Sequence, residues 1–143
     1  MSFLTYQPKR KVLLFFQRND DAWYFKFLSG YTHVAIGYVQ DDIVAITEPI
    51  FTGTLSYITL VPEDRGMWGH LDILELDIVQ TCDSKLVRPV FQTCATICQY
   101  LAGIRLGAIL PQTLYSRLTQ KSEAWLVAHG ITGVKKWGHS RCH

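Results

Sequence analysis

The sequence predicts an α+β fold. A strand-like run and a short helical segment open the chain, several strand-like segments follow, and helical periodicity dominates the last third. The chain has 143 residues, of which 48% are apolar, so it is long enough for one buried core and too short for two ordinary domains. We therefore expect a single domain over residues 1–143.

The charge balance makes nucleic acid an unexpected partner. Lys and Arg number 14 against 12 Asp and Glu, and the net charge of +2 lacks the dense basic patches that bind phosphate backbones. The basic run Lys9–Lys11 precedes only five apolar residues, Val12–Phe16, which is too short for a signal-peptide core or a membrane span. We expect a protein without a transmembrane segment in the cytoplasm.

The cysteines indicate free thiols. There are four, Cys82, Cys94, Cys98 and Cys142, but no secretion signal accompanies them, and the apolar content suffices for folding without disulfides. The spacing of His139, Cys142 and His143 matches no zinc template, and these residues lie at the chain end. We therefore expect neither a metal nor a cofactor.

The first half of the chain predicts strands around one short helix. Val12–Phe16 is an apolar run rich in strand formers and ends at polar residues 17–21. Ala22–Leu28 repeats aromatic and apolar residues at i, i+4 spacing and is followed by Ser29-Gly30, which predicts a helix that stops there. His33–Val39 and Ile43–Thr47 read as strands of a hairpin, since Gln40, Asp41 and Asp42 supply turn chemistry between them.

Two further strands are expected before the helices. Leu55–Val61 is bounded by Gly53 and Pro62 and reads as a strand, and residues 63–69 read as a loop. Leu71–Val79 alternates apolar and acidic residues, so one face of that strand should be exposed to water.

The helical part begins after Pro89. Cys94, Ile97, Cys98 and Leu101 share one helical face that ends at Gly103, so Cys94 should point inward at the helix start. A second helix is expected from Pro111 through Leu118. A third should span Glu123–His129 and close at Gly130.

His33 and Cys94 together indicate nucleophilic chemistry. A strand can hold an imidazole rigidly, and a helix N-terminus offers unpaired N–H groups and a dipole that favour a thiolate. A histidine on a strand and a cysteine at a helix start therefore predict a nucleophile and its base.

Five stretches of the chain resemble the circularly permuted branch of the NlpC/P60 papain-like superfamily, in which the strand histidine precedes the helix cysteine. They cover most of residues 12 to 118: Val12–Phe15, Trp23–Leu28, Tyr31–Ile36, Cys94–Ile104 and Leu110–Tyr115. The compact arrangement without an export signal is similar to phage-encoded and bacterial members, and a phage-encoded protein would act in the host cytoplasm.

The resemblance implies a permuted papain-like fold, with an antiparallel sheet or partial barrel packed against helices. It also implies a cysteine hydrolase or acyltransferase that acts on a peptide, isopeptide or acyl ester, with a third polar residue that orients His33. Cys94 would attack the carbonyl, His33 would carry the proton, and the Cys94 N–H would help to hold the oxyanion.

Hairpin geometry selects the third residue. If Asp41-Asp42 is a two-residue turn, His33 lies opposite Ile50, and Glu48 is its diagonal neighbour on the same face. A three-residue loop would instead bring Thr47 to that face. We expect Glu48, because a carboxylate fixes the imidazole tautomer and stabilises the imidazolium. Pro49 should limit pairing just beyond it.

Other interpretations stay open. Tyr31 would lie on the His33 face if the strand began there, and would then line the cleft. Cys98 is expected in the core and Cys82 as a bystander thiol. The alternative to an enzyme is an interaction or inhibitor protein that keeps this scaffold without turnover and binds a host or partner protein.

Overall fold

The computed structural model describes residues 9–18, 30–50, 53–60, 71–79 and 92–137. These residues form a six-stranded antiparallel sheet and three helices, which confirms the α+β prediction. The elements are, in chain order, β1 (Lys9–Gln17), β2 (His33–Gln40), β3 (Ile43–Ile50), β4 (Gly53–Leu60), β5 (Asp72–Val79), α1 (Cys94–Ala102), α2 (Pro111–Gln120), α3 (Glu123–Ala128) and β6 (Ile131–Lys136). The helix predicted at Ala22–Leu28, the loop at 63–69, Cys82 and the group His139, Cys142 and His143 lie outside the described residues.

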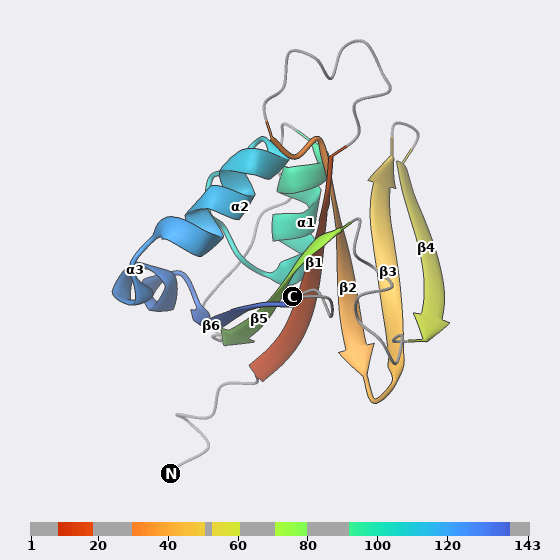
Figure 1. The fold of residues 1–143 in the computed structure, drawn as a ribbon, viewed down its shortest axis with the longest axis horizontal. Helices are drawn as coiled ribbons and strands as arrows, with labels where there is room; N and C mark the ends of the chain where they lie inside the picture. The colour runs from red at the N-terminus through yellow and green to blue at the C-terminus, as the bar shows by residue number, and fades with distance from the viewer. Residues whose placement is uncertain (1–8, 19–29, 51–52, 61–70, 80–91, 138–143) are drawn as a thin grey trace, which may run out of the picture.

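The sheet has the strand order β4-β3-β2-β1-β5-β6, so the first strand of the chain lies near its middle (Figure 1). The three helices lie on one side of the sheet, where α1 packs on β2 and β3 and α3 packs on β6. β3 and β4 extend beyond the helices on the other side of the molecule (Figure 1).

From Val12 to Phe16, β1 is buried on both faces, because it is a central strand and this stretch is apolar. Val12, Leu14 and Phe16 belong to the main core between the sheet and the helices. Leu13 and Phe15 alternate with them and belong to a second, smaller apolar cluster on the opposite face.

The hairpin between β2 and β3 has the predicted register. Gln40 pairs with Ile43, so Asp41-Asp42 is a two-residue turn, and Asp41 adopts a φ of 58° as such turns require. The alternative prediction of a three-residue loop is therefore wrong.

Pairing between β2 and β3 stops early. The last pair is Ile36 with Thr47, although β2 begins three residues before Ile36. Continued in register, β3 would bring Pro49 opposite Val34, and a proline has no N–H to give to a neighbouring strand. The two strands consequently separate at the end where β2 begins, as the sequence predicted from Pro49.

Four strands differ clearly from the prediction. β1 begins at Lys9 rather than Val12, and β3 continues to Ile50 rather than ending at Thr47. β4 spans Gly53–Leu60 rather than Leu55–Val61, and the strand β6 was not expected. β6 pairs with β5 but carries polar and glycine residues, so its pattern is not that of a typical strand. Long-range pairing rather than local sequence makes it a strand.

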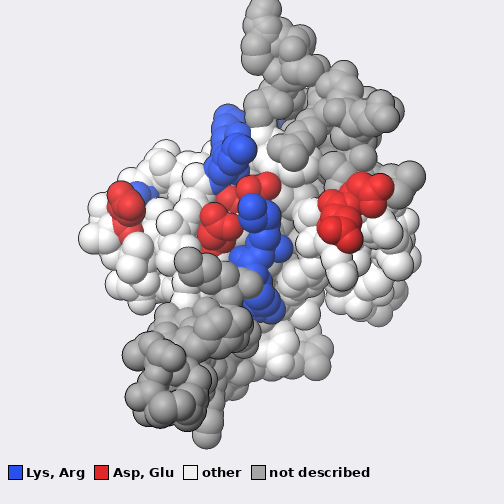
Figure 2. Space-filling view, turned by 90° about the horizontal axis from the view of Figure 1, so that it is seen from below, with Lys and Arg blue, Asp and Glu red and all other residues white. Residues whose placement is uncertain are grey.

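Basic and acidic side chains are intermixed on the surface. The face in Figure 2 shows Lys and Arg directly beside Asp and Glu, and Lys11 Nζ lies 3.5 Å from Glu75 and 4.0 Å from Asp77. No helix within the described ranges is long and apolar enough to cross a membrane.

Candidate active site

His33 is the first residue of β2 and lies on the sheet face away from the helices. Its neighbour on the same side of the strand is Ala35, which belongs to the second apolar cluster. The side chain is 24% exposed and lines a hollow of about 510 Å³ on that face. The imidazole is thus held at the point where β2 and β3 separate.

Glu48 on β3 orients the imidazole. His33 Nε2 lies 3.1 Å from Glu48 Oε1, across the separated ends of the two strands. The predicted two-residue register thereby brings His33 and Glu48 into contact, whereas Thr47 bonds instead to Ser56 at 3.2 Å. With Nε2 engaged by Glu48, Nδ1 is the ring nitrogen left for proton transfer.

Tyr57 on β4 is a third member of this chain of contacts. Its hydroxyl donates a 3.0 Å hydrogen bond to Glu48 Oε2, so both carboxylate oxygens have partners. Burial, followed by the hydrogen bond to Glu48, raises the pKa of Tyr57 above its usual value. Tyr57 was not predicted as a site residue, although the β3–β4 register places Glu48 opposite Leu55 and so makes Tyr57 a diagonal neighbour of Glu48.

Cys94 occupies the first position of α1, as predicted. Thr93 caps the helix through a reciprocal capping box, in which its hydroxyl accepts the N–H of Thr96 at 3.1 Å and Thr96 Oγ1 accepts the N–H of Thr93 at 2.7 Å. The cap leaves the N–H groups of Cys94 and Ala95 outside the capping bonds. The Cys94 side chain is half-buried and packs against the main core.

Both cysteines of α1 contact the backbone of Val34. Gln40 and Ile43 form the hydrogen-bonded pair that closes the hairpin. The N–H and C=O groups of every second residue of β2, counted back from Gln40, therefore face β3, and Val34 is one of these residues. β3 has separated at that level. The Val34 N–H faces the Cys94 sulfur instead and lowers the pKa of its thiol. Cys98 Sγ donates to the Val34 carbonyl at 3.5 Å.

Cys94 and His33 approach β2 from opposite faces. Cys94 comes from the helix side, where Val34 and Ile36 point, whereas His33 shares the other face with Ala35. Among the described contacts, no hydrogen bond joins the Cys94 thiol to the imidazole. The structure thus brings His33 and Glu48 together and places Cys94 against the peptide group that follows His33.

The environment of Cys94 does not give the thiolate that its helix position predicted. Burial raises the pKa of Cys94 above its usual value, and hydrogen bonds from the N–H groups of Val34, Ala95 and Cys94 offset this only in part. Burial, together with the nearby Cys94, raises the pKa of Cys98 further, and Cys98 is a fully buried core residue as expected. Both thiols are therefore protonated at neutral pH.

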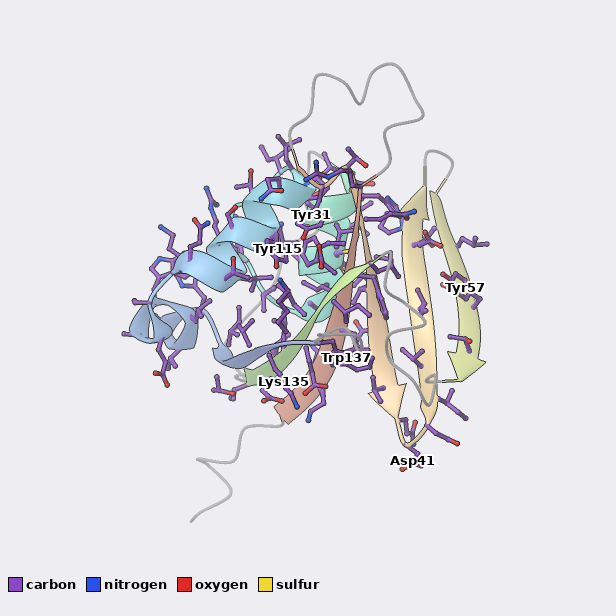
Figure 3. The ribbon with its side chains drawn as sticks, in the orientation of Figure 1. Tyr31, Asp41, Tyr57, Tyr115, Lys135 and Trp137 are labelled. Atoms are coloured by element: carbon purple, nitrogen blue, oxygen red, sulfur yellow. The ribbon has the colours of Figure 1, made fainter. Side chains whose placement is uncertain are left out.

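Tyr31 lies on the helix side, so the expectation that it shares the His33 face is wrong. β2 begins only at His33, and strand alternation does not extend back to Tyr31. Tyr31 and Tyr115 lie close together in Figure 3, and their ring centroids are 4.7 Å apart. The Tyr31 hydroxyl donates to Asp72. Burial, with the bond to Asp72, raises the pKa of Tyr31. Tyr57 lies apart from this cluster, on β4 (Figure 3).

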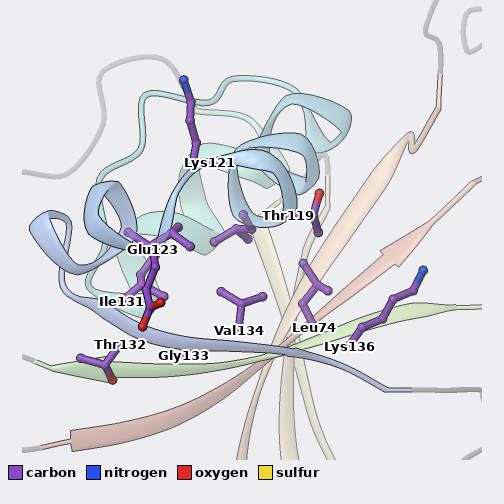
Figure 4. Close-up of a pocket in the computed structure, with 11 residues that line it drawn as sticks. Leu74, Thr119, Lys121, Glu123, Ile131, Thr132, Gly133, Val134 and Lys136 are labelled. Atoms are coloured by element: carbon purple, nitrogen blue, oxygen red, sulfur yellow. The ribbon is translucent and has the colours of Figure 1, made fainter.

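A second hollow, of about 490 Å³, lies between α2, α3 and strands β5 and β6 (Figure 4). Its described lining includes Leu74, Val134, Lys121 and Lys136 but neither Cys nor His. Within the described part of the chain, no three His, Cys, Asp or Glu side chains gather as a metal site would need.

No model of a known protein family, no curated protein and no solved structure matches this chain.

Proposed function

We propose that this protein is a cysteine-dependent hydrolase or acyltransferase that acts on an amide or ester. One observation carries the proposal: the Cys94 thiol lies against the backbone N–H of Val34, the residue next to His33, whose imidazole is held by Glu48. The order of histidine, acid and cysteine along the chain further supports a relationship to the permuted NlpC/P60 branch and its papain-like fold.

Proton transfer requires the imidazole to turn toward Cys94. His33 is partly exposed, and the strands are unpaired at this level, so its side chain can rotate without breaking a ladder of backbone hydrogen bonds. The mechanism requires this turn to bring Nδ1 toward the thiol while Nε2 stays within reach of Glu48. Because the thiol is protonated, His33 acts as a general base during the attack rather than as half of a preformed ion pair.

The reaction has two halves. Cys94 Sγ bonds to the substrate carbonyl carbon while its proton moves to His33, and the N–H groups of Cys94 and Ala95 hold the oxyanion. The carbonyl then re-forms, the C–N or C–O bond breaks, and His33 protonates the leaving amine or alcohol. Water or an acceptor alcohol or amine, deprotonated by His33, attacks the thioester and releases Cys94.

An acyl-trapping experiment tests this proposal. The protein is incubated with p-nitrophenyl acetate, and acetylated peptides are identified by mass spectrometry in wild type, His33→Gln and the matched control His129→Gln, which lies at the end of α3. We expect acetyl-Cys94 in wild type and in His129→Gln, and its formation should slow by on the order of a hundredfold in His33→Gln. Equal acetylation of Cys94 in all three proteins would overturn the proposal.

The second candidate is an interaction protein that keeps the scaffold without turnover and binds a host or partner protein. The raised pKa of Cys94 and the lack of a bond between its thiol and the imidazole in the described structure favour it. On this alternative, Cys94→Ala would leave the biological effect unchanged, whereas an enzyme would lose it.

A further inference from the structure

The hollow beside His33 has an apolar floor. It has a volume of about 510 Å³, within the range of small-molecule sites, and lies on the sheet face away from the helices. Phe15, Ala35 and Ile46 form its buried part, with exposed fractions of 4%, 5% and 6%. Leu71 adds an apolar wall ahead of β5. A ligand that enters the hollow would therefore remove apolar surface from water.

At the polar end of the hollow, the ionisable side chains are already in contact with one another. Glu48 accepts a hydrogen bond from Tyr57 and faces His33 Nε2, at 3.0 and 3.1 Å. His33, Glu48 and Tyr57 are the only ionisable residues in its described lining. A charged ligand group would find no free counter-ion there, and its desolvation would be uncompensated. The lining thus favours an uncharged ligand.

We propose that this hollow binds an uncharged apolar group of the substrate, an aliphatic or aromatic side chain or an acyl chain of medium length. The assignment rests on the proposed function, because the bound group is the part of the substrate that lies beside His33. It narrows the substrate class to neutral, apolar amides and esters.

Binding can be measured without turnover. In Cys94→Ala, dissociation constants are measured for a series of linear amides from acetamide to octanamide, and the His33 ring resonances report occupancy by NMR. We expect the affinity to rise about fourfold per added methylene until the hollow is full, and then to level off. Carboxylates and alkylammonium ions of the same length should bind more weakly than the amides. Affinity that is independent of chain length, or tighter binding of the charged series, would overturn the assignment.

Two variants locate the site. Leu71→Ser removes an apolar wall of the hollow and should weaken octanamide binding about tenfold. Ile43→Ser, which removes an exposed apolar residue outside the lining, should leave it unchanged. An equal loss in both would overturn the assignment, and thermal unfolding checks that both variants fold. If binding depends on chain length but Cys94 is not acetylated, the apolar binding site is supported and the proposed enzymatic function is wrong. If Cys94 is acetylated but binding does not depend on chain length, the proposed function is supported and the binding site is wrong.

Discussion

His33 on β2 and Glu48 on β3 are in contact across a gap that the two strands leave open, with 3.1 Å between Nε2 and Oε1. Backbone pairing does not reach this level, since it ends at Ile36 and Thr47. Beyond the last backbone pair, a side-chain contact therefore connects the two strands. Under the proposed mechanism, the same contact orients His33 as the base.

Glu48→Gln keeps an oxygen for His33 but removes the negative charge. We expect the rate of Cys94 acetylation to fall on the order of a hundredfold, because the imidazolium formed in the reaction loses its counter-ion. Stability should change little, since the pair is partly exposed. Acetylation kinetics and urea unfolding measure the two effects. An unchanged rate would remove Glu48 from the mechanism.

Tyr57→Phe removes only the hydroxyl that holds Glu48 Oε2. The acetylation rate should fall about fivefold, the equivalent of one hydrogen bond. Tyr100→Phe is the control, since Tyr100 is an exposed tyrosine of α1 and should leave the rate unchanged.

Tyr57 also predicts a pH dependence. Its pKa is raised in the folded protein by burial and by Glu48, so its hydrogen bond stabilises the fold below the unfolded pKa of about 10 and is lost as pH rises through the folded pKa. The pKa values of Tyr31 and Tyr38 are raised as well, so tyrosinate absorbance against pH should contain several late transitions. The late absorbance should lose the contribution of one tyrosine in Tyr57→Phe, and that contribution should appear at lower pH in Glu48→Gln. A transition at the same pH in Glu48→Gln would contradict the assigned cause.

Cys94 should react slowly with iodoacetamide at neutral pH. Burial raises the pKa of the thiol, so alkylation should rise only above pH ~8.5, the usual value for cysteine. Cys98 should react more slowly still. Peptide mass spectrometry resolves the two sites, and rapid labelling of Cys94 well below pH 8 would show a preformed ion pair instead.

Thr93→Ala should destabilise the protein by about 1 kcal/mol, because it removes the acceptor of the capping box and a 2.6 Å hydrogen bond to the Ile109 carbonyl. Thr93→Ser keeps the hydroxyl and should behave like wild type. Urea unfolding of the three proteins measures the difference, and a loss as large in Thr93→Ser would point to the methyl group rather than to the cap.

Pro49→Ala restores a backbone N–H opposite Val34. We expect the β2–β3 ladder to extend by one rung and the new amide at position 49 to be protected from hydrogen exchange. Cys94 should then acetylate more slowly, since the gap narrows. If the amide at this position exchanges freely, something other than the proline separates the strands.

The parts of the site that the sequence predicted are those set by local geometry. The turn at Asp41-Asp42 fixes the register and hence the contact between His33 and Glu48, and Thr93 and Cys94 begin a helix through a local capping pattern. The position of Cys94 relative to His33 depends on how α1 packs on β2. No periodicity contains that information, so the sequence could not show that the Cys94 thiol and the imidazole lie on opposite faces of β2.

The prediction for Tyr31 failed for a related reason. Its face was inferred by counting back along a strand, but the strand begins at His33. Tyr57 was missed because its role depends on pairing between β3 and β4, which the sequence analysis did not assign. β6 was missed because only its partner β5, more than fifty residues earlier in the chain, makes it a strand.

The end of the sheet at β4 has a consequence for handling the protein in solution. The strand Gly53–Leu60 contains no charged residue and no proline, and in the described sheet it is an edge, with Ile58 74% exposed. Edge strands usually carry lysine, proline or a bulge that prevents pairing with another molecule. We therefore expect turbidity to grow with protein concentration and warming, and Ile58→Lys to raise the solubility limit.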